Sequence, residues 1–232
     1  MIWETVCLKT AVCVLLRHAE RFAIEDGDVG LDVSLTEKGR RDARVWGAHH
    51  GEELRKIFSS PISRCADTAK CIVEGARFRQ KVSISTRLGD PGPYVVDGRI
   101  AWKNWEHMGS AELNRRLMTT REELPGMVEP LTGARRLVDF MLMTADRNPG
   151  IYAYVTHDNI IAITIAQLLG IVAEYNGAGW PDYLQVSAWW RSGSKLICEW
   201  GCRLFELPLW RNGVWKCADM VSCADARPYL YL

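Results

Sequence analysis

The sequence predicts an α/β protein in which helices cover both faces of a mainly parallel central sheet, a three-layer αβα sandwich. Two apolar runs of strand length, at residues 12–16 and 151–155, are continuous rather than alternating. Such runs are typical of parallel strands that are buried on both faces. Amphipathic segments of helix length separate the predicted strands, and this alternation of strand and helix is the pattern of an α/β fold.

The first predicted unit is the strand "VCVLL" at residues 12–16, followed by a helix that begins after Thr36. The hydroxyl of Thr36 can cap the helix, and Glu37 suits the positive end of the helix dipole. Ala43 and Trp46 mark the side of this helix that we expect to be buried.

The second unit is the short strand "RKIFSS", which Pro61 stops, and the helix at residues 62–76. The segment "KVSIST" then alternates as a strand should, which places Val82 and Ile84 on one face. Residues 87–98 are rich in glycine and proline and are predicted to form an ordered loop.

The segment at about residues 90–130 is irregular, and we expect an insertion or lid there. The pattern after it predicts a helix that ends near Pro149, a buried strand, a second helix that ends at Gly170, and further strands between residues 184 and 210. Since no internal repeat or linker is present, we expect a single domain over residues 1–232.

Composition excludes several classes of protein. With 48% apolar and 25% charged residues and a formal net charge of +1, the chain offers no basic surface for nucleic acid or for an anionic membrane. No apolar run approaches the roughly 20 residues that span a bilayer. The first residues include Glu4 and Lys9 and lack a small-residue cleavage site, so we expect no signal peptide and a cytoplasmic protein.

The eight cysteines are predicted to be free thiols, because the chain is large and shows no export signal. Cys198, Cys202, Cys217 and Cys223 lack the spacing of a zinc site. His49 and His50 form a pair that could bind a metal, but their place at the end of a polar helix favours a solvated helix terminus. We therefore expect no metal and no cofactor.

Three predicted strands end in residues that suit phosphate chemistry. Arg17 and His18 follow the first strand, Arg64 lies in the first turn after the second, and His157 follows the strand at residues 151–156. The carboxyl ends of parallel neighbours meet at one crevice, where open α/β sheets bind their ligands. Guanidinium groups match phosphoryl oxygens and stay charged, and a neutral imidazole can attack phosphorus.

Four segments, "LLRHAER", "SLTEKGRRDA", "SSPISRCADTA" and "VTHDNIIA", resemble in this order the signature segments of the histidine phosphatase superfamily, which includes phosphoglycerate mutases and acid phosphatases. The resemblance covers about residues 11–170 and implies a phosphoglycerate mutase-like fold. It also implies a phosphohistidine intermediate on His18, with Arg17, Arg64 and His157 binding the transferred phosphoryl group.

Two residues depart from the family pattern. Ala19 stands where the family commonly has glycine, a small change that we expect to be tolerated. Glu20 stands where relatives often carry a neutral polar residue, and we predict that it binds substrate and disfavours an anionic one.

The proton donor has two candidates. Asp158 follows His157 directly, as in the acid phosphatase branch, but an aspartate there can also cap the next helix. Asp90 lies 26 residues after Arg64, about where the phosphoglycerate mutase branch carries its acid, but aspartate before Pro-Gly is also ordinary turn chemistry. The length of the chain and the lack of an export signal favour Asp90.

The predicted function is a metal-independent phosphomonoester hydrolase that acts on a small phosphorylated substrate through a phosphohistidine. Two alternatives stay open, a phosphoglycerate mutase-type phosphoryl transfer and a non-catalytic module that binds a phospho-ligand or phosphoprotein. The substrate and the oligomeric state are not predicted.

Overall fold

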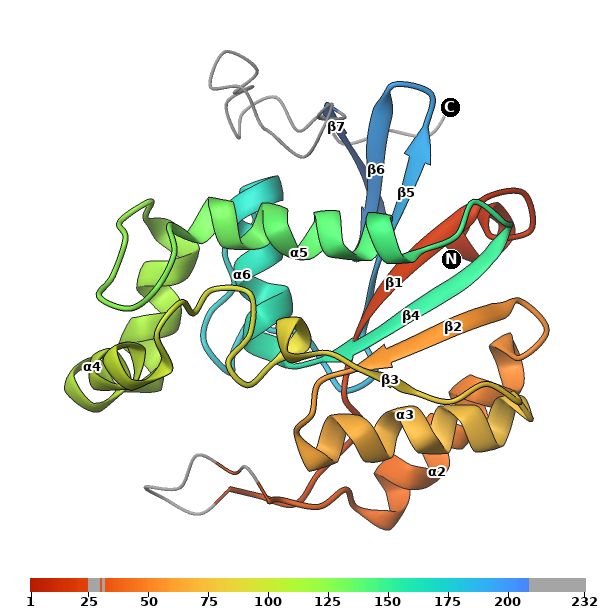
Figure 1. Ribbon diagram of the computed structural model, residues 1–232, viewed down its shortest axis with the longest axis horizontal. Coiled ribbons are helices and arrows are strands. Elements are labelled where there is room, and N and C mark those ends of the chain that lie inside the picture. The colour runs from red at the N-terminus through yellow and green to blue at the C-terminus, as the bar shows by residue number, and fades with distance from the viewer. Residues whose placement is uncertain (25–29, 31, 209–232) are drawn as a thin grey trace.

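A seven-stranded sheet forms the centre of the computed structural model, which describes residues 1–24, 30 and 32–208 (Figure 1). The strand order is β3-β2-β4-β1-β5-β6-β7. The four strands from β3 to β1 are parallel, and the three from β5 to β7 extend the sheet in antiparallel fashion. The strands are β1 (Ala11–Arg17), β2 (Leu54–Ser59), β3 (Ser83–Ile84), β4 (Gly150–Thr156), β5 (Val186–Ser192), β6 (Lys195–Trp200) and β7 (Arg203–Pro208).

Helices cover both faces of the sheet, so the predicted fold class is confirmed. Two helices lie together on one face, and two cover the other, with a fifth at the end of the molecule (Figure 1). The first pair is α2 (Glu37–His50) and α3 (Ser63–Ala76); the others are α5 (Pro130–Thr144), α6 (Asp158–Leu169) and α4 (Gly98–Thr119). A short helix, α1 (Ile2–Val6), precedes β1, and a 3-10 turn spans Thr86–Leu88.

Strand β1 is buried on both faces, as its continuous apolar run predicts. Val14 and Leu16 pack in the cluster on the side of α2 and α3, whereas Cys13 and Leu15 pack in the cluster on the side of α5 and α6. All four are at most 1% exposed. Each fully buried Val or Leu side chain contributes about 1.5–3 kcal/mol, which anchors the strand that carries Arg17 and His18.

The pair α2 and α3 packs backbone against backbone. A Cβ atom on Gly47 would lie 2.1 Å from the carbonyl oxygen of Ile72, and one on Gly75 would lie 1.9 Å from that of Arg44. Only glycine permits this approach. The predicted cap is also present, because the hydroxyl of Thr36 accepts from the backbone N–H of Gly39 at 2.9 Å.

The structure differs from the sequence prediction in three places. Strand β3 has two residues instead of six, and of the two residues predicted on one face Ile84 is 56% exposed, whereas Val82 packs partly against the core before the strand begins. Helix α1 was not expected. Most of the segment at residues 90–130 is the helix α4, which is interrupted at Gly109, and its buried Leu117 and Met118 join the cluster of α5 and α6.

Two further findings bear on the composition. Within the described ranges, no helix is long and apolar enough to cross a membrane. The six cysteines there are free, as expected, and five of them are buried; Cys217 and Cys223 lie outside the described residues.

Candidate active site

The carboxyl ends of β1, β2 and β4 converge at one edge of the sheet (Figure 1). Arg17 at the end of β1 pairs with Thr156 at the end of β4, and Ser59 at the end of β2 pairs with Val155. The residues that follow these strands therefore meet. The structure brings five of the predicted site residues together there: Arg17, His18, Arg64, His157 and Asp158.

His18 is held in one tautomer by its backbone neighbour. Its Nδ1 lies 2.8 Å from the carbonyl oxygen of Ala19, which can only accept, so Nδ1 carries the proton in the neutral ring. The other nitrogen, Nε2, then presents its lone pair and accepts from Nε of Arg64 at 3.2 Å. The side chain is 2% exposed. This arrangement leaves a nucleophilic nitrogen directed at a cation.

Arg64, in the first turn of α3, connects the two imidazoles. Besides its bond to His18, it donates from Nη2 to Nδ1 of His157 at 3.2 Å and from Nη1 to the carbonyl oxygen of Gly30. Because the guanidinium plane is rigid, these three contacts fix its orientation in the crevice.

Arg17, at the end of β1, is held by a separate set of contacts. Its Nη2 pairs with Oδ2 of Asp158 at 2.7 Å, and its Nη1 donates to the carbonyl oxygen of Pro181. The ring of Tyr183 covers the guanidinium at 4.1 Å and also lies 5.8 Å from the ring of His18. The Nε of Arg17 is buried and has no hydrogen-bond partner in the part of the chain that the structure describes. A buried donor of this kind fits a phosphoryl oxygen as its partner.

His157 uses both ring nitrogens within the protein. Since arginine can only donate, Nδ1 of His157 accepts from Arg64, and Nε2 therefore carries the proton toward the hydroxyl of Ser60 at 3.1 Å. The ring stands edge-on to that of His18, with 5.7 Å between centroids. In this state His157 holds Arg64 in place.

The two carboxylates that were candidates for the proton donor have different surroundings. Both oxygens of Asp158 are engaged, Oδ2 with Arg17 and Oδ1 with the backbone N–H of Asn159 at 2.8 Å. Asp90 is exposed, and it follows Gly89, which packs so closely that a Cβ there would lie 2.6 Å from Nε2 of His157. The Asp90 loop therefore borders the crevice.

Glu20 contacts the start of α2. Its carboxylate accepts from the hydroxyl of Thr36 at 2.8 Å and pairs with Lys38 at 3.3 Å, and these bonds lower the pKa of Glu20. These contacts tie the loop after His18 to the start of α2, and the role of Glu20 in substrate choice stays a prediction.

Tyr183 and Ser60 contact the predicted site residues, and the sequence did not identify them as functional. Tyr183 comes from the segment before β5, which has no pattern that marks it as near Arg17. Ser60 follows a strand, and only the contact with His157 distinguishes it from an ordinary turn residue.

Burial sets the charge state of both imidazoles. Burial is the largest cause that lowers the pKa of His18 to about 3, with smaller contributions from the neighbouring Arg64 and Arg17. Burial, then Arg64 and His18, also holds the pKa of His157 well below its ordinary value. Both rings are therefore neutral near pH 7, as a nucleophilic imidazole has to be.

Folding stability should fall in acid because of His18. The unfolded chain protonates this residue below about pH 6.5, whereas the folded protein does so only near pH 3. The stability that the folded protein gains from a neutral His18 is therefore complete above about pH 6.5 and is lost as the pH falls toward about 3. Between about pH 7.5 and pH 5, the wild-type protein should lose about 2 kcal/mol more than a His18→Gln variant. Urea unfolding of both proteins at several pH values measures this difference, and parallel curves would contradict it.

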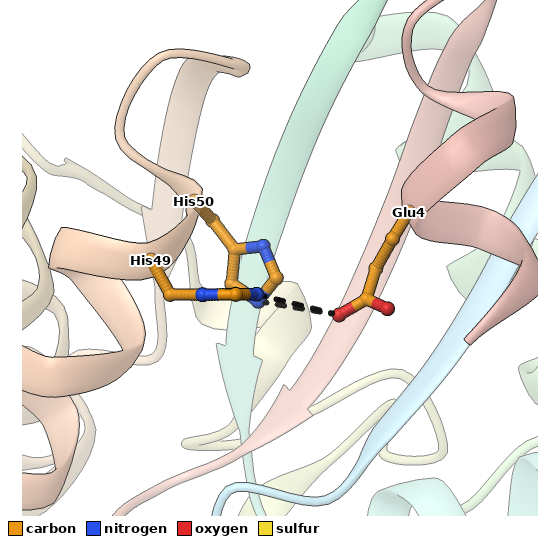
Figure 2. Close-up of side chains that lie close together, drawn as sticks. All are labelled: Glu4, His49 and His50. Atoms are coloured by element: carbon orange, nitrogen blue, oxygen red, sulfur yellow. Dashed lines mark ion pairs between the residues drawn. The ribbon is translucent and has the colours of Figure 1, made fainter.

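A second cluster of ligand-type side chains lies at the opposite end of α2. Glu4, His49 and His50 have their Nε2 and carboxylate atoms within 4.8 Å of one another, and Figure 2 shows Glu4 of α1 directed at both imidazoles. The predicted solvated terminus is wrong for His50, which is 7% exposed and packs between the rings of Trp3 and Trp46. It holds for His49, which is exposed.

Comparison with known proteins gives a family match. The histidine phosphatase superfamily (branch 1) matches residues 13–187. A 2,3-bisphosphoglycerate-dependent phosphoglycerate mutase from Thermoplasma acidophilum is 30% identical over 162 residues, which cover 68% of this chain and 76% of the mutase.

Solved structures share the fold at lower identity. A mycobacterial glucosyl-3-phosphoglycerate phosphatase is 21% identical with a TM-score of 0.51, covering 78% of this chain and 90% of its own. A mutant phosphoserine phosphatase from Entamoeba histolytica, in complex with phosphoserine, is 16% identical with a TM-score of 0.54, covering 81% and 94%.

Proposed function

This chain belongs to the histidine phosphatase superfamily, and on that premise we propose that it is a phosphomonoester hydrolase that works through a phosphohistidine on His18. One observation carries the proposal above the others. The Nδ1 proton of His18 is bound to the Ala19 carbonyl, so that the lone pair on Nε2 faces the guanidinium of Arg64. A nucleophile and an anion-binding group are thus adjacent.

In the proposed reaction the phosphoryl group enters between His18 and the two arginines. One phosphoryl oxygen accepts a hydrogen bond from the Nε–H of Arg64, which Nε2 of His18 accepts in the free protein. Another accepts from the Nε–H of Arg17, which has no hydrogen-bond partner among the described residues. Nε2 of His18 then forms the N–P bond while the P–O bond to the leaving group breaks. The two guanidiniums stabilise the charge on the phosphoryl oxygens, and this requires no metal ion at phosphorus.

His157 acts mainly through Arg64. A direct bond between His157 and the phosphoryl group, as the resemblance implies, requires exchange of its hydrogen bond to Ser60 for one to a phosphoryl oxygen. The ring then contributes a neutral donor, because its pKa lies well below the ordinary value.

We assign proton transfer to Asp90 and the positioning of Arg17 to Asp158. Both carboxylate oxygens of Asp158 are already engaged, Oδ2 with Arg17 and Oδ1 with the backbone N–H of Asn159, so this side chain holds the guanidinium in position. Asp90 borders the crevice from an exposed loop. It would protonate the leaving oxygen and, as a carboxylate, then take a proton from the water that cleaves the N–P bond and regenerates His18.

A mutase is the second candidate, and the 30% identity to a phosphoglycerate mutase favours it specifically. In that reaction a hydroxyl of the bound substrate, rather than water, receives the phosphoryl group from His18. Both functions use His18, Arg17, Arg64 and Asp90, and they differ only in the molecule that accepts the phosphoryl group from His18.

Product analysis tests the function. Purified protein treated with EDTA is expected to release free phosphate from p-nitrophenyl phosphate and from at least one phosphorylated metabolite, with no isomerised product. Loss of turnover on chelation would contradict metal-independent chemistry. Conversion of 3-phosphoglycerate to its isomer, with less free phosphate than isomer, would identify a mutase instead.

A further inference from the structure

The cluster of Glu4, His49 and His50 lies far from the proposed reaction. Thr36, at the start of α2, neighbours Glu20 in the loop after His18, whereas His49 and His50 end the same helix. A helix of 14 residues is about 21 Å long. The cluster is also near the beginning of β1, and the site is at the end of that strand. Any ligand here would therefore occupy a separate site.

Its donor atoms converge from two elements. Oε1 of Glu4 lies 4.0 Å from Nε2 of His49 and 3.9 Å from Nε2 of His50 (Figure 2). The other carboxylate oxygen accepts from the amino group of Met1, which leaves Oε1 directed at the imidazoles. Around a tetrahedral zinc ion, neighbouring ligand atoms lie about 3.3 Å apart, since each bond measures about 2.0–2.1 Å. The three ligand atoms lie within 4.8 Å of one another, so side-chain shifts of at most about 1.5 Å close the cluster on an ion.

Packing and charge prepare the cluster for a cation. His50 is fixed between Trp46, at 4.4 Å between ring centroids, and Trp3, at 5.1 Å. Two negative groups, Glu4 and Glu53, act on His50 against one positive group, the amino group of Met1, and the carbonyl end of α2 adds the negative pole of a helix dipole. His49 and Glu4 are the more exposed ligands, and their side chains have room to adjust.

We propose that Glu4, His49 and His50 bind one zinc ion, with water as the fourth ligand, and that the ion ties α1 to the end of α2. Two imidazoles and one carboxylate form a donor set that suits zinc better than magnesium or calcium, which prefer oxygen ligands. Binding stabilises the folded protein because the unfolded chain does not hold the three ligands together. The role is structural and adds no step to the reaction at His18.

Metal titration tests the proposal. The protein freed of metal with EDTA and then desalted is expected to bind one equivalent of Zn²⁺ by calorimetry and to gain thermal stability as Zn²⁺ is added. Replacing the exposed His49 by alanine, or Glu4 by glutamine, is expected to weaken this binding at least tenfold and to remove the thermal shift. Co²⁺ in place of Zn²⁺ reports the ligands, because tetrahedral Co²⁺ absorbs visible light.

Two control variants separate this site from other ligands. His107→Ala removes a histidine of α4 that belongs to neither cluster, and His18→Ala removes the imidazole of the reaction site; both are expected to keep one equivalent of Zn²⁺ with unchanged affinity. The proposal is overturned if His49→Ala and Glu4→Gln bind as tightly as the wild type, if His18→Ala abolishes binding, or if the Co²⁺ form shows a thiolate charge-transfer band. The His49→Ala variant should retain phosphatase activity, which also shows that it folds.

Discussion

Replacing His18 by alanine is expected to lower kcat by about 10⁴-fold or more and to abolish phosphoenzyme formation. The proton on its Nδ1 is bound to the Ala19 carbonyl, which directs the lone pair of Nε2 at Arg64. Without this imidazole, water would have to attack phosphorus directly from a site built for a nitrogen nucleophile. Steady-state turnover of p-nitrophenyl phosphate measures the loss.

The covalent intermediate gives a second readout for the same variant. Wild-type protein quenched in base during turnover of a ³²P-labelled substrate should carry an acid-labile label, as expected for an N–P bond. The His18→Ala protein should carry none, although it should still bind phosphate or vanadate through Arg17 and Arg64. A labelled His18→Ala protein, or one with full turnover, would end the phosphohistidine mechanism.

The Asp90→Asn variant is expected to lose about 10²-fold or more in kcat/KM, which reports phosphoenzyme formation, on alkyl phosphates, and less than tenfold on p-nitrophenyl phosphate. An alkoxide needs a proton as it leaves, whereas p-nitrophenolate is stable without one. The loss should therefore depend on the leaving group. Parallel kinetics on a series of phosphate esters of increasing leaving-group pKa measure this dependence.

Asp158→Asn is the matched control, because it removes a carboxylate from the same crevice. It pairs with Arg17 and donates no proton in the proposed reaction, so it should change the turnover of alkyl and aryl esters by the same factor. If Asp158→Asn shows the leaving-group dependence and Asp90→Asn does not, the two roles must be exchanged.

The sequence predicts the fold class and the meeting of strand ends well, because both follow from patterns along the chain. Continuous apolar runs identify β1 and β4, and the residues directly after them are brought to one edge by parallel pairing. Arg64 is predicted in the same way, from its place in the first turn after the second predicted strand, and the order of the four family segments supports it. These predictions require only local patterns and one rule about parallel sheets.

Contacts between distant segments are what the sequence pattern does not reveal. The five residues of α1 are too few to show helical periodicity, so the burial of His50 against Trp3 was not predicted. Tyr183 covers Arg17 from a loop without a regular pattern. The choice between Asp90 and Asp158 also depends on a tertiary contact, the ion pair of Asp158 with Arg17.

The glycine contacts between α2 and α3 make one wall of the crevice intolerant of change. The main chains of the two helices touch at Gly47 and Gly75. Backbone contacts, rather than replaceable side chains, therefore set the position of α3, the helix that carries Arg64. By contrast, Asp90 follows Gly89 in a loop beside His157, and Tyr183 covers Arg17 from another loop. Substitutions in these loops can therefore change which substrate is accepted, while the spacing between Arg64 and His18 is preserved.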